Sequence, residues 1–182
     1  MPLEGDSRFK DLKKAYAKGV ELKGKTLGVL GFGRIGQATA KIALGIGMKV
    51  VAFDPFMETA KLTLDFYDGQ NVLKQSDFIT LHVPAQKDYV ISTKEFDLMK
   101  DKACIVNAAR GGVIDEIALV EAIDKGKIAH AALDVFEKEP NPEIQLLMNP
   151  NISLTPHIGA ATNEAQERIG GELAEQIIGI LG

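Results

Sequence analysis

The chain of 182 residues is long enough for one well-packed domain and too short for two large ones. Its net charge of −4 argues against a nucleic-acid or membrane-surface partner, because both need a basic face. No apolar run approaches the ~18 residues of a membrane span, and the first residues lack a signal-peptide core. The single cysteine, Cys104, excludes an internal disulfide and fits a reducing compartment. We therefore expect a cytoplasmic protein that contacts neither nucleic acid nor membrane.

The beginning of the chain is predicted to form an arm rather than a core of its own. The stretch "SRFKDLKKAYAKG" places Phe9, Leu12 and Tyr16 at the three-to-four-residue spacing of an amphipathic helix, which the last glycine ends. We assign residues 1–21 to this arm helix and its linker, and residues 22–182 to the main domain.

Six short apolar segments recur along the main domain, with starts 23 to 29 residues apart. Their continuous apolarity predicts strands buried on both faces, and hence a parallel sheet. Helical patterns between most of them predict a doubly wound α/β fold with strand order 3-2-1-4-5-6. The stretch between the second and third strands carries weak helix signals and is predicted to be mostly irregular. Residues 162–181 are predicted to form a long C-terminal helix. The predicted strands are residues 26–31, 49–54, 78–83, 103–108, 128–135 and 152–155.

The sequence "GFGRIG" at residues 31–36 follows the first predicted strand and opens a helix, the context that the motif G-x-G-x-x-G requires. Gly31 permits a tight turn, Gly33 lets a pyrophosphate approach the backbone, and Gly36 lets the helix close on the strand. The N–H groups of Arg34 and Ile35 would face the phosphate charge. The motif therefore predicts a bound dinucleotide.

An acidic residue, Asp54, ends the second predicted strand, 21 positions after the middle glycine of the motif. Its carboxylate can accept hydrogen bonds from an adenosine ribose and would repel a 2′-phosphate, which favours NAD over NADP. The alternative is a turn aspartate before Pro55. The third strand ends in His82, Val83 and Pro84, which we expect to form an apolar wall against adenine. We expect His82 to have no catalytic role.

The fourth, fifth and sixth predicted strands each end in polar residues beside small ones, where nicotinamide would lie in this fold. Arg110 follows the fourth strand, Asp134 and Glu139 end the fifth, and His157 follows the sixth. Taken singly, each has an ordinary alternative as a loop cation, a cap or a solvated loop residue. Their convergence at one edge of the sheet predicts a catalytic site.

These four residues suit the oxidation of a 2-hydroxy acid, or the reverse reduction, with NAD carrying the hydride. His157 would take the hydroxyl proton, and Glu139 would favour its protonated form. Arg110 would hold the substrate carboxylate and polarise the reacting oxygen. Asp134 would orient the nicotinamide carboxamide. No metal site is expected.

Four motifs, "GKTLGVLGFGRIG", "NAARGGVIDE", "ALDVFEKEP" and "TPHIGAAT", resemble the signatures of the D-isomer-specific 2-hydroxyacid dehydrogenases. The resemblance extends from Leu22 to the end of the chain and implies a Rossmann NAD-binding domain. It implies that Arg110, Glu139 and His157 are the catalytic residues. The NAD contacts that it implies are Arg34, Ile35, Asp54, Val83, Ala108, Ala109, Arg110, Asp134, His157, Gly159 and Ala160.

The run "HIGAATNEAQ" is most similar to the D-3-phosphoglycerate dehydrogenase branch of this family, which implies oxidation of D-3-phosphoglycerate to 3-phosphohydroxypyruvate in serine biosynthesis. Two alternatives stay open: a hydroxypyruvate or glyoxylate reductase, and a non-enzymatic NAD sensor similar to the C-terminal-binding-protein corepressors. The resemblance also implies a homodimer formed through this domain, with a contribution from the arm helix.

Members of the family carry most of a second, substrate-binding domain before the glycine motif. This chain has only the short arm there, so we expect the substrate domain to be absent from it. The isolated domain is expected to bind NAD but to turn over slowly, because the substrate domain closes the cleft and excludes water.

Overall fold

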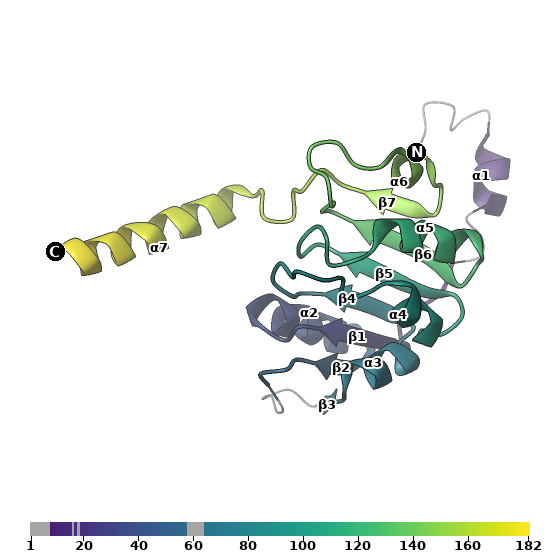
Figure 1. The fold of residues 1–182 in the computed structure, drawn as a ribbon, viewed down its shortest axis with the longest axis horizontal. Helices are drawn as coiled ribbons and strands as arrows, with labels where there is room; N and C mark the ends of the chain where they lie inside the picture. The colour runs from purple at the N-terminus through teal and green to yellow at the C-terminus, as the bar shows by residue number, and fades with distance from the viewer. Residues whose placement is uncertain (1–7, 16, 18, 58–63) are drawn as a thin grey trace.

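The computed structural model describes residues 8–15, 17, 19–57 and 64–182, and in these ranges seven strands form one sheet. Every pair of neighbouring strands is parallel. The order is β3-β2-β1-β4-β5-β6-β7 (Figure 1), which confirms the predicted doubly wound fold. The strands are β1 (Thr26–Leu30), β2 (Lys49–Phe53), β3 (Asp65–Phe66), β4 (Phe78–Leu81), β5 (Ala103–Asn107), β6 (Ile128–Leu133) and β7 (Ile152–Leu154).

The helices cover the two faces of the sheet unequally. They are α1 (Phe9–Ala15), α2 (Arg34–Gly45), α3 (Gly69–Gln75), α4 (Thr93–Leu98), α5 (Glu116–Asp124), α6 (Ile144–Met148) and α7 (Asn163–Leu181). Each of the helices α3 to α6 contacts the next one along the chain. Together they enclose the larger core, which includes Ile79 and Leu119. Helix α2 packs on β1 and β2 over a smaller core. The register places Val106 and His130 on the α2 side, where both are exposed, so this face is open over β5 and β6 in the described part of the chain.

The position of one strand differs from the prediction. Residues 78–83 were expected as the third strand, beyond β2, but they contribute β4, which pairs with β1 at the centre of the sheet. The edge position belongs to β3, and α3 follows it, so the prediction of a mostly irregular stretch is wrong for residues 64–77. A strand of two residues is too short to show an alternating pattern, and α3 buries only Val72 and Leu73. Residues 58–63 lie outside the described part of the chain.

Helix α7 extends away from the sheet (Figure 1). The Thr162 hydroxyl begins it by accepting a hydrogen bond from the Ala165 N–H at 3.1 Å. All its side chains except that of Ala165 are exposed. The predicted arm helix is α1, although Tyr16, which was predicted on its apolar face, is not among the described residues. None of the described helices is long and apolar enough to cross a membrane.

Candidate active site

The glycine motif forms the turn between β1 and α2. Gly31 has a φ of +88°, and a Cβ there would lie 2.5 Å from the carbonyl oxygen of His82. A Cβ on Gly36 would lie 2.2 Å from the carbonyl oxygen of Gly31, so only glycine lets α2 start this close to the turn. A Cβ on Gly33 would meet no atom within 4 Å, so the backbone there is open to a ligand. The loop therefore fits a pyrophosphate at the start of α2, with the backbone of Arg34 and Ile35 in the first helical turn.

Asp54 follows β2 and is tied to the glycine motif. One carboxylate oxygen accepts the Phe32 N–H at 2.7 Å, and the other accepts the Phe56 N–H at 2.9 Å. Phe32 itself is fully buried and packs edge-to-face on Phe66, with ring centroids 5.2 Å apart. Each carboxylate oxygen has a further lone pair, so these contacts leave Asp54 able to accept from a ribose. The structure thus adds a second task for Asp54, that of anchoring the loop.

The end of β4 lies beside the glycine motif because β4 pairs with β1. The His82 Nε2 is 3.1 Å from the Thr80 hydroxyl, and burial lowers the pKa of His82. Val83 and Pro84 follow it, and a Cβ on Gly31 would lie 3.1 Å from the Val83 Cγ1. The central position of β4 therefore brings the predicted adenine wall to the point where the sheet reverses its strand order.

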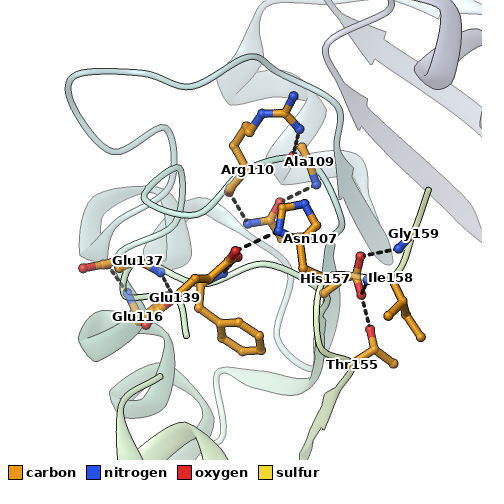
Figure 2. Close-up of polar contacts among 12 residues, drawn as sticks. Asn107, Ala109, Arg110, Glu116, Glu137, Glu139, Thr155, His157, Ile158 and Gly159 are labelled. Carbon is orange, nitrogen blue, oxygen red and sulfur yellow. Dashed lines mark hydrogen bonds and ion pairs between the residues drawn. The ribbon is translucent and has the colours of Figure 1, made fainter. Parts of the chain in front are cut away.

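The loop after β5 is shaped by Asn107, which is buried. Its Nδ2 donates to the Arg110 carbonyl at 3.0 Å, and its Oδ1 accepts the Ala109 N–H at 3.1 Å. The Arg110 side chain is exposed, and its Nη1 donates to the Ala109 carbonyl at 2.6 Å (Figure 2). The guanidinium thus points away from the other predicted catalytic side chains, and Ala108 lies exposed at the start of the loop.

Glu139 and His157, from the loops after β6 and β7, are in direct contact. The His157 Nδ1 lies 2.8 Å from the Glu139 Oε2, and Figure 2 shows the two side chains facing each other. The hydrogen bond from His157, with a second from the Phe136 N–H, holds the pKa of Glu139 below its usual range. His157 has a φ of +54°, a left-handed conformation that is uncommon for residues other than glycine. A backbone of this kind indicates that its surroundings hold the histidine in place.

Asp134, at the end of β6, supplies that support. Its carboxylate is buried and accepts hydrogen bonds from the Thr155 hydroxyl at 2.5 Å, the Ile158 N–H at 2.9 Å and the Gly159 N–H at 2.8 Å. Burial raises the pKa of Asp134, but these three bonds outweigh it and hold the pKa below its usual range. The donors flank His157 on both sides in the chain. Asp134, predicted to orient the nicotinamide, therefore fixes the turn that carries the histidine.

An open cavity of about 780 Å³ lies in front of these loops. Arg110, Glu139 and His157 all line it, together with residues 86–89. The three predicted catalytic residues thus meet around one space, although the guanidinium does not contact the other two side chains in this conformation. Gly159 and Ala160 continue the exposed loop beyond His157. The described residues contain no group of three or more His, Cys, Asp or Glu side chains that could hold a metal ion.

Sequence reasoning missed four residues that hold these loops in position. Asn107 and Thr155 were overlooked because each ends or follows a strand as an unremarkable polar residue. Glu116 and Glu137 exchange hydrogen bonds between the start of α5 and the loop after β6. Glu116 was overlooked because an acidic residue in the first turn of a helix is common for local reasons. Thr155, Glu116 and Glu137 bond to residues 21 positions away in the chain, which spacing does not reveal, whereas Asn107 bonds within its own loop.

The comparisons with known proteins agree on one family. Residues 4–159 match the family model described as D-isomer specific 2-hydroxyacid dehydrogenase, NAD binding domain. The chain is 50% identical over 175 residues to a hydroxypyruvate reductase of Thermotoga maritima, covering 93% of this chain and 57% of that protein. It is also 50% identical over 170 residues to a D-3-phosphoglycerate dehydrogenase of Methanocaldococcus jannaschii, covering 90% of this chain and 32% of that protein.

The chain is also similar in fold to a solved structure. The holo form of D-mandelate dehydrogenase from Rhodotorula graminis superposes with a TM-score of 0.83 at 33% identity, covering 87% of this chain and 49% of that one. The chain thus spans about half, or less, of the length of these relatives.

Proposed function

Because the chain belongs to the D-isomer-specific 2-hydroxyacid dehydrogenases and contains their NAD-binding domain, we propose that it serves the oxidation of a D-2-hydroxy acid to the 2-oxo acid by hydride transfer. One observation carries this proposal: the 2.8 Å contact between His157 and Glu139 at a cavity that Arg110 also lines. A histidine oriented by a carboxylate beside an arginine suits proton transfer to or from a bound carboxylic acid. The relatives described above are named as a reductase and dehydrogenases, which favours an enzyme over an NAD sensor.

Each group of the site has a role in the proposed reaction. NAD, when bound, supplies the hydride acceptor in oxidation or the donor in reduction. With Nδ1 on Glu139, the Nε2 of His157 is the nitrogen left to take the hydroxyl proton, or to give it back. Arg110 holds the substrate carboxylate through its guanidinium. Residues 31–36 and Asp54 hold the pyrophosphate and ribose, as their open backbone and carboxylate lone pairs allow.

For the substrate we propose D-3-phosphoglycerate, oxidised to 3-phosphohydroxypyruvate in serine biosynthesis. The run at residues 157–166 supports this assignment, as does the relative from Methanocaldococcus jannaschii. The equal similarity to a hydroxypyruvate reductase supports the second candidate, reduction of hydroxypyruvate or glyoxylate.

We expect calorimetry to detect NAD binding by the 182-residue chain, with weaker binding of NADP because Asp54 repels a 2′-phosphate. NADH oxidation by the 182-residue chain should be measured, at high protein concentration, with 3-phosphohydroxypyruvate, hydroxypyruvate and glyoxylate. We expect kcat/KM to be about tenfold or more higher for the phosphorylated acid. A preference for either unphosphorylated acid would establish the second candidate, and absence of NAD binding would refute the cofactor assignment.

We also propose a cytoplasmic homodimer formed through this domain. The open sheet face with Val106 and His130, and the exposed Phe9 of α1, offer surface that a second copy would cover. The free Cys104 suits a reducing compartment. Light scattering should give twice the mass of one chain, and a monomer at every concentration would contradict the dimer.

A further inference from the structure

Two loops of the proposed active site are packed directly against each other. One follows β5 and carries Arg110, and the other follows β6 and carries Glu139. A Cβ on Gly111 would lie 1.8 Å from the carbonyl oxygen of Phe136, so the two backbones touch at this point. The position of the second loop therefore depends on the hydrogen bonds that hold it against the first loop.

Two glutamates exchange hydrogen bonds across this contact. The Oε1 of Glu116, the first residue of α5, accepts the Glu137 N–H at 2.8 Å. In return, the Oε1 of Glu137 accepts the Glu116 N–H at 3.2 Å. Figure 2 shows this pair beside Glu139 and His157. The exchange joins the start of α5 to the loop that carries Glu139.

The neighbouring N–H group in the same loop is bound by Glu139 itself. The Phe136 N–H donates to the Glu139 Oε1 at 3.0 Å, while the Glu139 Oε2 contacts the His157 Nδ1. Two consecutive N–H groups are thus held by two different glutamates. The two N–H groups belong to neighbouring peptide groups that share the Phe136 Cα, so a displacement of the chain that frees the Glu137 N–H also moves the Phe136 N–H.

Glu116 is held in an unfavourable place for a carboxylate. Its residue is 4% exposed, and its Oε2 has no hydrogen-bond partner among the described residues. Burial raises the pKa of Glu116 accordingly. An apolar side chain could fill the same space without this unsatisfied oxygen, so packing of α5 does not account for a glutamate here.

We propose that Glu116 is a positioning residue for Glu139: by accepting the Glu137 N–H it fixes the adjoining peptide group, so that the Phe136 N–H stays on the Glu139 carboxylate. The inference deepens the proposed function, since Glu139 is the group that orients His157 there. The charge of Glu116 is not required for this task, but its acceptor oxygen is.

The test is a pH titration of the Glu139 side-chain carboxyl by carbon NMR in the 182-residue chain, with the Phe136 amide signal as a second reporter. Glu116→Ala removes the acceptor, and we expect the pKa of Glu139 to rise toward its ordinary value by roughly half a pH unit or more. Glu116→Gln keeps an acceptor oxygen and should retain most of the lowered pKa. Glu121→Ala, which removes an exposed glutamate from the same helix, should leave the titration unchanged.

Each outcome decides the proposal. Unchanged Glu139 and Phe136 signals in Glu116→Ala would overturn it, as would equal shifts in the Ala and Gln variants. Amide spectra of residues remote from the loops identify a variant that has lost its fold. If Glu116→Ala is such a variant, Glu116→Met, which fills the same space without an acceptor oxygen, takes its place and should give the same rise in the pKa of Glu139. Dehydrogenase activity is measured separately, so a failure of the proposed function and a failure of this inference are distinguishable.

Discussion

Replacing His157 with asparagine should lower kcat by about 100- to 10,000-fold, the range expected when a general acid–base group is lost. Asparagine is the suitable replacement because the φ of +54° at this position is tolerated by asparagine better than by most residues. Affinity for NAD should change little, because the glycine motif and Asp54 are untouched. The measurement is steady-state turnover by the 182-residue chain, together with NAD calorimetry.

His130→Asn is the matched control for this experiment. His130 is exposed on β6 and lines a different cavity, on the open face of the sheet. Turnover of this variant should equal that of the unmodified protein, and light scattering of the variant checks that the proposed dimer, whose surface includes His130, is unchanged. If His157→Asn retained normal kcat, another residue would have to carry the proton, and the proposed role of the pair with Glu139 would fail.

Replacing Gly36 with alanine should destabilise the domain by about 3 kcal/mol, because overpacking against backbone cannot relax by a side-chain rotation. The added Cβ would lie 2.2 Å from the carbonyl oxygen of Gly31 and 3.3 Å from Val29 Cγ1. Helix α2 must therefore move away from the turn, and NAD affinity should fall with it. Urea unfolding and NAD calorimetry measure the two effects.

Substitutions at two other glycines of this region distinguish an effect on stability from an effect on NAD binding. Gly45 ends α2 with no atom near its Cβ position, so Gly45→Ala should be neutral or stabilise by up to about 1 kcal/mol. Gly33→Ala should leave stability unchanged but weaken NAD binding about tenfold or more, since its Cβ would enter the space assigned to the pyrophosphate. A Gly36→Ala protein as stable as the Gly45→Ala protein would contradict the packing argument.

Much of the fold followed from the sequence because its signals are local. The strands, the glycine motif and the long terminal helix each depend on residues close together in the chain, and the NAD-binding family was recognisable from four short motifs. The position of β4 was predicted wrongly because β3, with two residues, is too short to recognise. One unrecognised edge strand was enough to displace its neighbour in the expected order.

The sequence by itself determined which residues end the strands. It follows that Arg110, Glu139 and His157 lie at one edge of the sheet. Only the tertiary structure decided what holds them there. Asp134 bonds to residues 24 and 25 positions away, and Glu116 to a residue 21 positions away. These contacts exist because β5, β6 and β7 are neighbours in the sheet, with a helix between each pair in the chain. Hydrogen bonds formed across such crossovers leave no periodic trace in the sequence, and they set the geometry of the site.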